Sequence, residues 1–153
     1  MTAAVFAAYR ESGYNVMLFL HIASVLVAFS PAFVHPLLSR QSRDLGAGRS
    51  QLLAKFAGND RRIYAPALIL VGLFGFAMQG MSDDVIEMGD TWFWLSIVLW
   101  IAMNGVLHAM LIPAERAAAG GDADAERKAD LAGAIITILL IVVLYLMVFK
   151  PGA

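Results

Sequence analysis

Four long apolar segments dominate this chain, at residues 14–38, 63–81, 92–113 and 131–149. Each approaches or exceeds the roughly 20 residues that a helix needs to cross the hydrocarbon layer of a membrane. Because lipid offers no partner to backbone N–H and C=O groups, each segment should be helical. The sequence therefore predicts an all-α polytopic membrane protein. We expect one membrane domain over residues 1–153, folded as an antiparallel bundle of four transmembrane helices.

Composition supports a membrane protein and excludes several classes of function. Hydrophobic residues make up 60% of the chain and charged residues only 15%, whereas about 45–50% apolar residues is usual in soluble domains. The net charge is −1, which gives no indication of a nucleic-acid partner. The chain contains no cysteine, which excludes disulfides, thiolate chemistry and cysteine-ligated zinc or iron–sulfur sites.

The basic residues are distributed very unevenly between the connections. The segment MSDDVIEMGD, which joins the second and third spans, contains four acids and no base. Basic residues concentrate in cytoplasmic loops of membrane proteins. The sequence therefore predicts that the first and third connections are cytoplasmic and both termini extracytoplasmic. Nine of the eleven basic residues lie in or beside these two connections, and two do not: Arg40, Arg43, Arg49, Lys55, Arg61, Arg62, Arg116, Arg127 and Lys128, against Arg10 and Lys150.

Side chains that can cap a helix precede each of the later apolar segments. Their oxygens can accept hydrogen bonds from the first free N–H groups of a helix. The carboxylates near these positions are predicted to be solvated surface groups. The predicted caps are Ser50 for a short helix, Asn59 or Asp60 for the second span, Asp90 or Thr91 for the third, and Asp122 or Asp124 for the fourth.

Small residues recur at helical spacing within the spans. Helices in lipid pack through such residues, which let the backbones approach closely. Gly72 and Gly75 lie on one side of the second span, and the third span aligns Trp100, Asn104 and His108. Asn104 is an amide near the middle of the membrane, so we expect it to face other helices.

All three histidines lie in apolar segments. His21 should lie in the outer leaflet, whereas His35 and His108 should both lie near the cytoplasmic ends of their spans. Two imidazoles from facing helices can ligate a haem in the core of a bundle. The sequence therefore allows one haem b, held by His35 and His108, or by His21 with an outer methionine. A structural role for His35, next to Pro36, is the alternative.

Methionines gather on the same side as His21. Thioethers together with an imidazole are soft ligands that suit Cu(I). The alternative is that methionine fills irregular contacts between helices. The predicted copper ligands are His21, Met17, Met78, Met81 and Met147, and Met88 lies on the same side.

Four stretches carry a resemblance to a known family: LFLHIASVLVAF, APALILVGLFGFAM, WFWLSIVLWIAMNGVLHAMLIPAER and LMVFKP. Together they resemble the bacterial integral membrane proteins grouped as domain of unknown function 2269, over nearly the whole chain. This resemblance implies four helices in a bacterial inner membrane and no established activity.

The early histidine of the first span, His21, also gives a more distant likeness to two other four-helix groups. One is the copper-resistance D type membrane domain, and the other is the haem-binding J type protoporphyrinogen oxidase. In the latter family a histidine of the first span and a lysine on a later span serve the haem. This sequence departs from that pattern because no lysine lies inside a span, and only the flanking Lys55, Lys128 and Lys150 remain.

No catalytic motif is present: there is no phosphate-binding glycine loop, no HExxH and no nucleophile elbow. The prediction is therefore an accessory or interaction subunit of a membrane complex, with lipid and a membrane protein or a second copy as partners. The alternatives are a haem b redox protein and a copper-handling protein. A visible spectrum of the purified protein, with metal analysis, would separate the three.

Overall fold

The computed structural model describes residues 12–42, 44–83 and 85–152, and it is all-helical over this part of the chain. Arg10 and Arg43, both used above to predict orientation, lie outside the described residues. Four helices are long and apolar enough to cross a membrane, at Ser12–Gln41, Gly48–Gly80, Thr91–Ala119 and Ala123–Phe149. The predicted all-α architecture with four helices of membrane-spanning length is confirmed. Their segments are α2 (Ser12–Gln41), α3 (Ala47–Asn59), η1 (Asp60–Tyr64), α4 (Ala65–Gly80), α5 (Thr91–Val106), η2 (Leu107–Leu111), α6 (Ile112–Ala119) and α7 (Ala123–Phe149).

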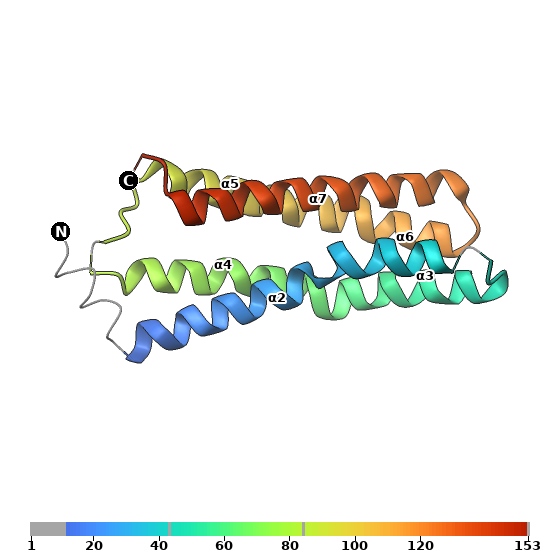
Figure 1. Ribbon diagram of the computed structural model, residues 1–153, viewed down its shortest axis with the longest axis horizontal. Helices are drawn as coiled ribbons and strands as arrows, with labels where there is room; N and C mark the ends of the chain where they lie inside the picture. Colours follow the sequence, from blue (N-terminus) through green and yellow to red (C-terminus); the bar gives the residue numbers. More distant parts are fainter. Residues whose placement is uncertain (1–11, 43, 84, 153) are drawn as a thin grey trace.

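The helices run along one axis, and successive long helices point in opposite directions (Figure 1). The start of α2, residues 85–90 and the end of α7 lie at one end, which we call the acidic end. Residues 44–46 and 120–122 lie at the other, which we call the basic end. Toward the acidic end, helix α2 packs mainly against α4, and α5 mainly against α7. Toward the basic end, α6 packs against both α3 and α7, which joins these pairs into one bundle.

The surface of the bundle is apolar. Large hydrophobic side chains such as Phe19, Leu26 and Phe33 are exposed along the whole of α2. No more than 28% of the most apolar window of any long helix is buried inside the protein. A water-soluble bundle would hide this surface, whereas lipid solvates it. The exposed faces therefore mark the lipid contact.

The long helices are longer than a hydrocarbon layer is thick. They contain 27 to 33 residues, or about 40–50 Å at 1.5 Å per residue, whereas the hydrocarbon layer is about 30 Å thick. His35, Asp60 and Glu115 each lie about six turns from the acidic end. If the membrane is aligned with that end, these three residues lie at the opposite boundary of the hydrocarbon.

Two of the predicted helix starts are confirmed, and two are wrong. The carboxylate of Asp122 accepts from the backbone N–H of Asp124 and Ala125, and Asp90 directly precedes α5. In contrast, no helix begins at Asn59 or Asp60, because α3, η1 and α4 form one continuous helix. Ser50 lies inside α3 rather than at its start. Asp60 therefore lies in the middle of a continuous helix, where it is buried in the bundle instead of exposed at a helix start.

Two π-helical turns, η1 and η2, each end two residues before a proline, Pro66 and Pro113. Proline lacks the N–H that would continue the α-helical pattern, and its ring crowds the preceding turn. A wider turn with an i→i+5 hydrogen bond gives room for the ring. A π-helical turn holds more than four residues, whereas an α-helical turn holds 3.6. Side chains four positions apart therefore point in nearly the same direction across the wider turn, which changes which residues face inward.

Glycines allow close contact between the helices. A Cβ at Gly72 would overlap the ring of Trp100, whose indole N–H donates to the carbonyl of Leu68 at 2.7 Å. A Cβ at Gly75 would touch the ring of His21 at 3.5 Å. The prediction that these glycines form packing surfaces is confirmed. Asn104 is half-buried and donates to the carbonyl of Trp100 in its own helix.

Candidate functional site

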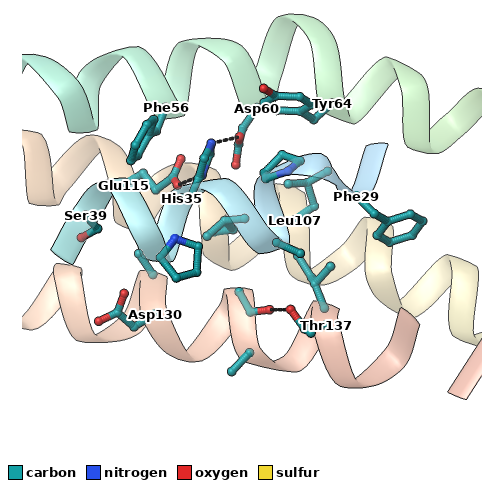
Figure 2. A pocket seen from close by; sticks show the side chains of 18 of the residues that line it. Phe29, His35, Ser39, Phe56, Asp60, Tyr64, Leu107, Glu115, Asp130 and Thr137 are labelled. Carbon is teal, nitrogen blue, oxygen red and sulfur yellow. Dashed lines mark hydrogen bonds and ion pairs between the residues drawn. The ribbon is translucent and has the colours of Figure 1, made fainter. Parts of the chain in front are cut away.

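Three ionisable side chains from three helices meet at one point in the bundle: His35 of α2, Asp60 of η1 and Glu115 of α6. Nδ1 of His35 lies 3.3 Å from Oε1 of Glu115, and Nε2 lies 3.8 Å from Oδ1 of Asp60. One potential ligand atom from each residue lies within 4.8 Å of the other two. Figure 2 shows the imidazole between the two carboxyl groups.

Both carboxyl groups are buried and poorly partnered. Asp60 is 1% exposed and Glu115 is 4% exposed. When both groups are ionised, both oxygens of Asp60 and Oε2 of Glu115 have no hydrogen-bond partner, and the two carboxyl groups can bond to each other only if one carries a proton. In the described part of the chain only the basic group of His35 lies within ion-pair distance of either. Removing an ionised carboxylate from water costs several kcal/mol unless the charge is compensated. The site therefore needs either protons or a cation in addition to His35.

Local structure fixes the orientation of the three side chains. The ring of His35 stacks on Phe56, with centroids 4.0 Å apart and planes 8° from parallel, and Tyr64 packs edge-on against it. Asp60 is the first residue of η1, and Glu115 follows Pro113 by two residues. Because the imidazole is held by aromatic contacts, its two nitrogens stay directed at the two carboxyl groups.

A cavity of about 540 Å³ adjoins the cluster and extends between α2 and α7. Asp130 and Thr137 of α7 lie on the wall opposite His35 (Figure 2). Toward the basic end its lining includes the exposed residues Arg40 and Asp130. The polar lining of the cavity therefore continues from the buried carboxyl groups toward exposed charged residues at the basic end.

The chemistry of this donor set is that of a cation site. Two carboxylates and a neutral imidazole carry two negative charges, which either one divalent cation or two protons would neutralise. Carboxylate oxygens with one imidazole nitrogen form a mixed set that suits divalent first-row transition metals. Metal-binding histidines commonly donate their second ring N–H to a carboxylate, and the position of His35 between two carboxyl groups permits this.

His108 does not join His35. It lies in η2 with an exposed side chain, and it lines neither this cavity nor the second one described below. The structure therefore places His35 inside the bundle and His108 on its outer surface. Haem ligation by this pair stays a prediction, but the two residues are not brought to one cavity.

His21 lines a second cavity of about 650 Å³, in the half of the bundle toward the acidic end. Of the four predicted methionine ligands, Met78 and Met147 line this cavity, whereas Met17 and Met81 do not. Nδ1 of His21 lies 2.9 Å from the carbonyl oxygen of Val71. Since a carbonyl only accepts, Nδ1 carries the proton and Nε2 has a free lone pair.

Sequence reasoning missed Asp60 and Glu115. Asp60 looked like the cap of a new helix, and Glu115 looked like part of a charged connection after the third apolar segment. The available signal was the four-residue spacing of Met103, Leu107, Leu111 and Glu115, all of which are buried. This spacing indicates one inward face only if the helix contains a wider turn.

Comparison with protein-family models, with curated proteins and with solved structures finds no match to this chain. The resemblances described above therefore remain predictions. The function has to be argued from the geometry of the site.

Proposed function

We propose that the protein binds a divalent first-row transition-metal ion inside its helical bundle, with His35, Asp60 and Glu115 as ligands. The observation that carries this proposal is the unpartnered state of both buried carboxyl groups. A divalent ion would compensate their charge and occupy their free lone pairs together. The resulting site would be electrically neutral, as a low-dielectric environment favours.

The donor set narrows the choice of ion. Zinc, manganese and iron(II) accept mixed nitrogen and oxygen ligands, whereas Cu(I) prefers thiolate and thioether sulfur. The nearby Phe56 and Tyr64 exclude water from one side of the imidazole. Because they accept this donor set, Zn²⁺ and Mn²⁺ are suitable probes.

A purely structural ion pair is the main competing explanation. A protonated His35 bridging both carboxylates would hold three helices together without any metal. The distances of 3.3 and 3.8 Å to the imidazole nitrogens permit this explanation too. The two explanations differ in what happens when Zn²⁺ is added and when one carboxylate is made neutral.

We expect the purified full-length protein in detergent to bind Zn²⁺ or Mn²⁺ at one saturable site. The variants Asp60→Asn and Glu115→Gln should lower the affinity by more than about 100-fold, since even a hydrogen-bond partner of a ligand contributes about 10–100-fold. Affinity should fall as the pH is lowered, because protons compete for the same oxygens and nitrogen. Isothermal titration calorimetry measures all three effects.

Asp44→Asn and Glu87→Gln are matched controls, because both carboxylates are exposed and neither belongs to the cluster or lines its cavity. They should leave the affinity unchanged. Equal affinity in the Glu115→Gln variant and the unaltered protein would contradict the proposal, as would the absence of saturable binding.

We infer an orientation for the bundle from the distribution of charge. The basic end faces the cytoplasm of a bacterial cell and the acidic end faces outward, so that the chain lies in the inner membrane with both termini outside. In intact spheroplasts a Glu87→Cys variant should react with a membrane-impermeant thiol reagent, and an Asp44→Cys variant should not. The chain has no other cysteine, so the labelling is unambiguous. The reverse pattern would invert the orientation.

A second candidate function is ligation of haem or copper by His21. The observation that favours it is the hydrogen bond from Nδ1 to the carbonyl of Val71, which leaves Nε2 as a free ligand atom in a cavity that Met78 and Met147 also line. The spectrum and metal analysis described above test this candidate. The accessory role predicted from the sequence stays a prediction, and it is compatible with either site.

A further inference from the structure

The two cavities lie one after the other along the bundle. The cavity at the cluster occupies the half toward the basic end, and the cavity at His21 occupies the half toward the acidic end. Phe29 is the one side chain, among the described residues, that lines both. Its ring is 6% exposed, so it is held between the cavities rather than in lipid.

A thin apolar layer surrounds Phe29. Leu68 and Ile136 line the cavity on one side of it, and Met103 and Leu140 line the cavity on the other side. All five side chains are buried and belong to one hydrophobic cluster. This layer is apolar, buried and contains no charge, so in the described conformation it blocks an ion.

The helix beside Phe29 lacks one backbone hydrogen bond. Pro31 lies inside α2 and cannot donate to the carbonyl of Val27, one turn before it. The hydroxyl of Ser30 donates to that carbonyl instead, at 2.9 Å. A local hydrogen bond has replaced the helical one, which makes this turn of α2 easier to deform than the rest. Displacement of the Phe29 ring would join the two cavities and admit water.

Ligands are available on both sides of the layer. The basic-end cavity offers the cluster, and the acidic-end cavity offers Nε2 of His21 with the thioethers of Met78 and Met147. The cluster is neutral with one divalent cation or with two protons, so exchange of one for the other leaves no net charge buried in the membrane.

We propose that the protein transports its divalent cation across the membrane in exchange for protons, and that Phe29 is the partition between the two cavities. This inference rests on the proposed metal site. It adds movement of the ion through the bundle, which binding alone does not require.

The test uses the full-length protein reconstituted in vesicles of phosphatidylethanolamine and phosphatidylglycerol that contain a zinc-sensitive dye. Zn²⁺ added outside should enter faster than in protein-free vesicles, and faster still when the interior is more acidic. The Asp60→Asn variant should abolish this entry. The Phe29→Ala variant should raise the initial rate several-fold without changing the affinity measured in detergent.

Two controls make the result specific. Phe33→Ala removes the same ring from the same helix at a position that is 69% exposed to lipid, so it should leave the rate unchanged. The double variant Phe29→Ala/Asp60→Asn should be as slow as Asp60→Asn, because entry still depends on the cluster.

The outcomes separate the two proposals. Zn²⁺ that binds with normal affinity but enters no faster than in the Asp60→Asn vesicles would overturn transport and leave the metal site standing. A Phe29→Ala rate equal to that of the unaltered protein would overturn the role of Phe29. Equally fast entry in the double variant would show a nonspecific leak and overturn transport through the cluster. Absence of Zn²⁺ binding in detergent would remove both proposals.

Discussion

In the absence of metal, the Glu115→Gln variant should have a higher apparent melting temperature than the unaltered protein. Two buried carboxyl groups that share one imidazole repel each other when both are ionised, and the neutral amide removes this repulsion. The amide can also donate to the oxygens of Asp60 that now have no partner. Because like charges close together in a low-dielectric interior repel each other, the neutral amide should stabilise the folded protein.

A structural ion pair predicts the opposite sign. If His35 is protonated and bridges both carboxylates, removing one of them should destabilise the protein, as the loss of one buried partner commonly does by about 3–5 kcal/mol. Thermal unfolding in detergent with a chelator, at pH 8, measures the sign directly. Glu87→Gln is the control, because this carboxylate is exposed at the acidic end.

Added Zn²⁺ should then reverse the order of stability. A ligand at about 100 times its dissociation constant stabilises the folded state by about 2.7 kcal/mol, so the unaltered protein should gain stability and Glu115→Gln should not. A lower melting temperature of Glu115→Gln with chelator, combined with no response of the unaltered protein to Zn²⁺, would identify a structural ion pair.

The Gly72→Ala variant should be strongly destabilised, although alanine is the better helix former by about 1 kcal/mol. The new methyl group would overlap the ring of Trp100, which cannot move freely because its indole N–H is bonded to the carbonyl of Leu68. Overpacking of this kind typically costs about 1–3 kcal/mol, occasionally more. The α4–α5 contact should loosen, which thermal unfolding and tryptophan fluorescence would both report.

Gly105→Ala is the matched control for this prediction. Gly105 lies in α5, and a Cβ there would meet nothing within 4 Å. The same substitution should therefore be neutral or slightly stabilising. Equal effects at Gly72 and Gly105 would show that the contact with Trp100 does not constrain the packing.

The number of membrane-length helices could be predicted from the sequence because lipid imposes simple rules. About 20 apolar residues and a satisfied backbone are enough to define a span. The cap at Asp122 was also predictable, since a short polar side chain after GlyGly marks the start of a helix. These features depend on local sequence alone.

The cluster could not be predicted in the same way. An aspartate shortly before an apolar run is typical of a helix start, and only the continuation of α3 through η1 into α4 places Asp60 inside the bundle. On the sequence alone His35 and His108 could both face inward, as a shared haem would require. The η2 turn keeps Leu107 and Leu111 buried, while His108 between them is exposed. The directions in which these side chains face depend on the π-helical turns, which the hydrophobic pattern of the sequence does not reveal.

Because of the two π-helical turns, the geometry of the cluster depends on the number of residues in each helix as well as on which residues are present. Each turn holds one residue more than an α-helical turn would: η1 contains Asp60, and η2 precedes Pro113 and Glu115. Loss of one residue there would leave a good transmembrane helix of similar hydropathy. However, it would rotate Asp60 or Glu115 by about 100° relative to the rest of the helix. For this protein, insertions and deletions near Pro66 and Pro113 are therefore more harmful to the site than most single substitutions in the same turns.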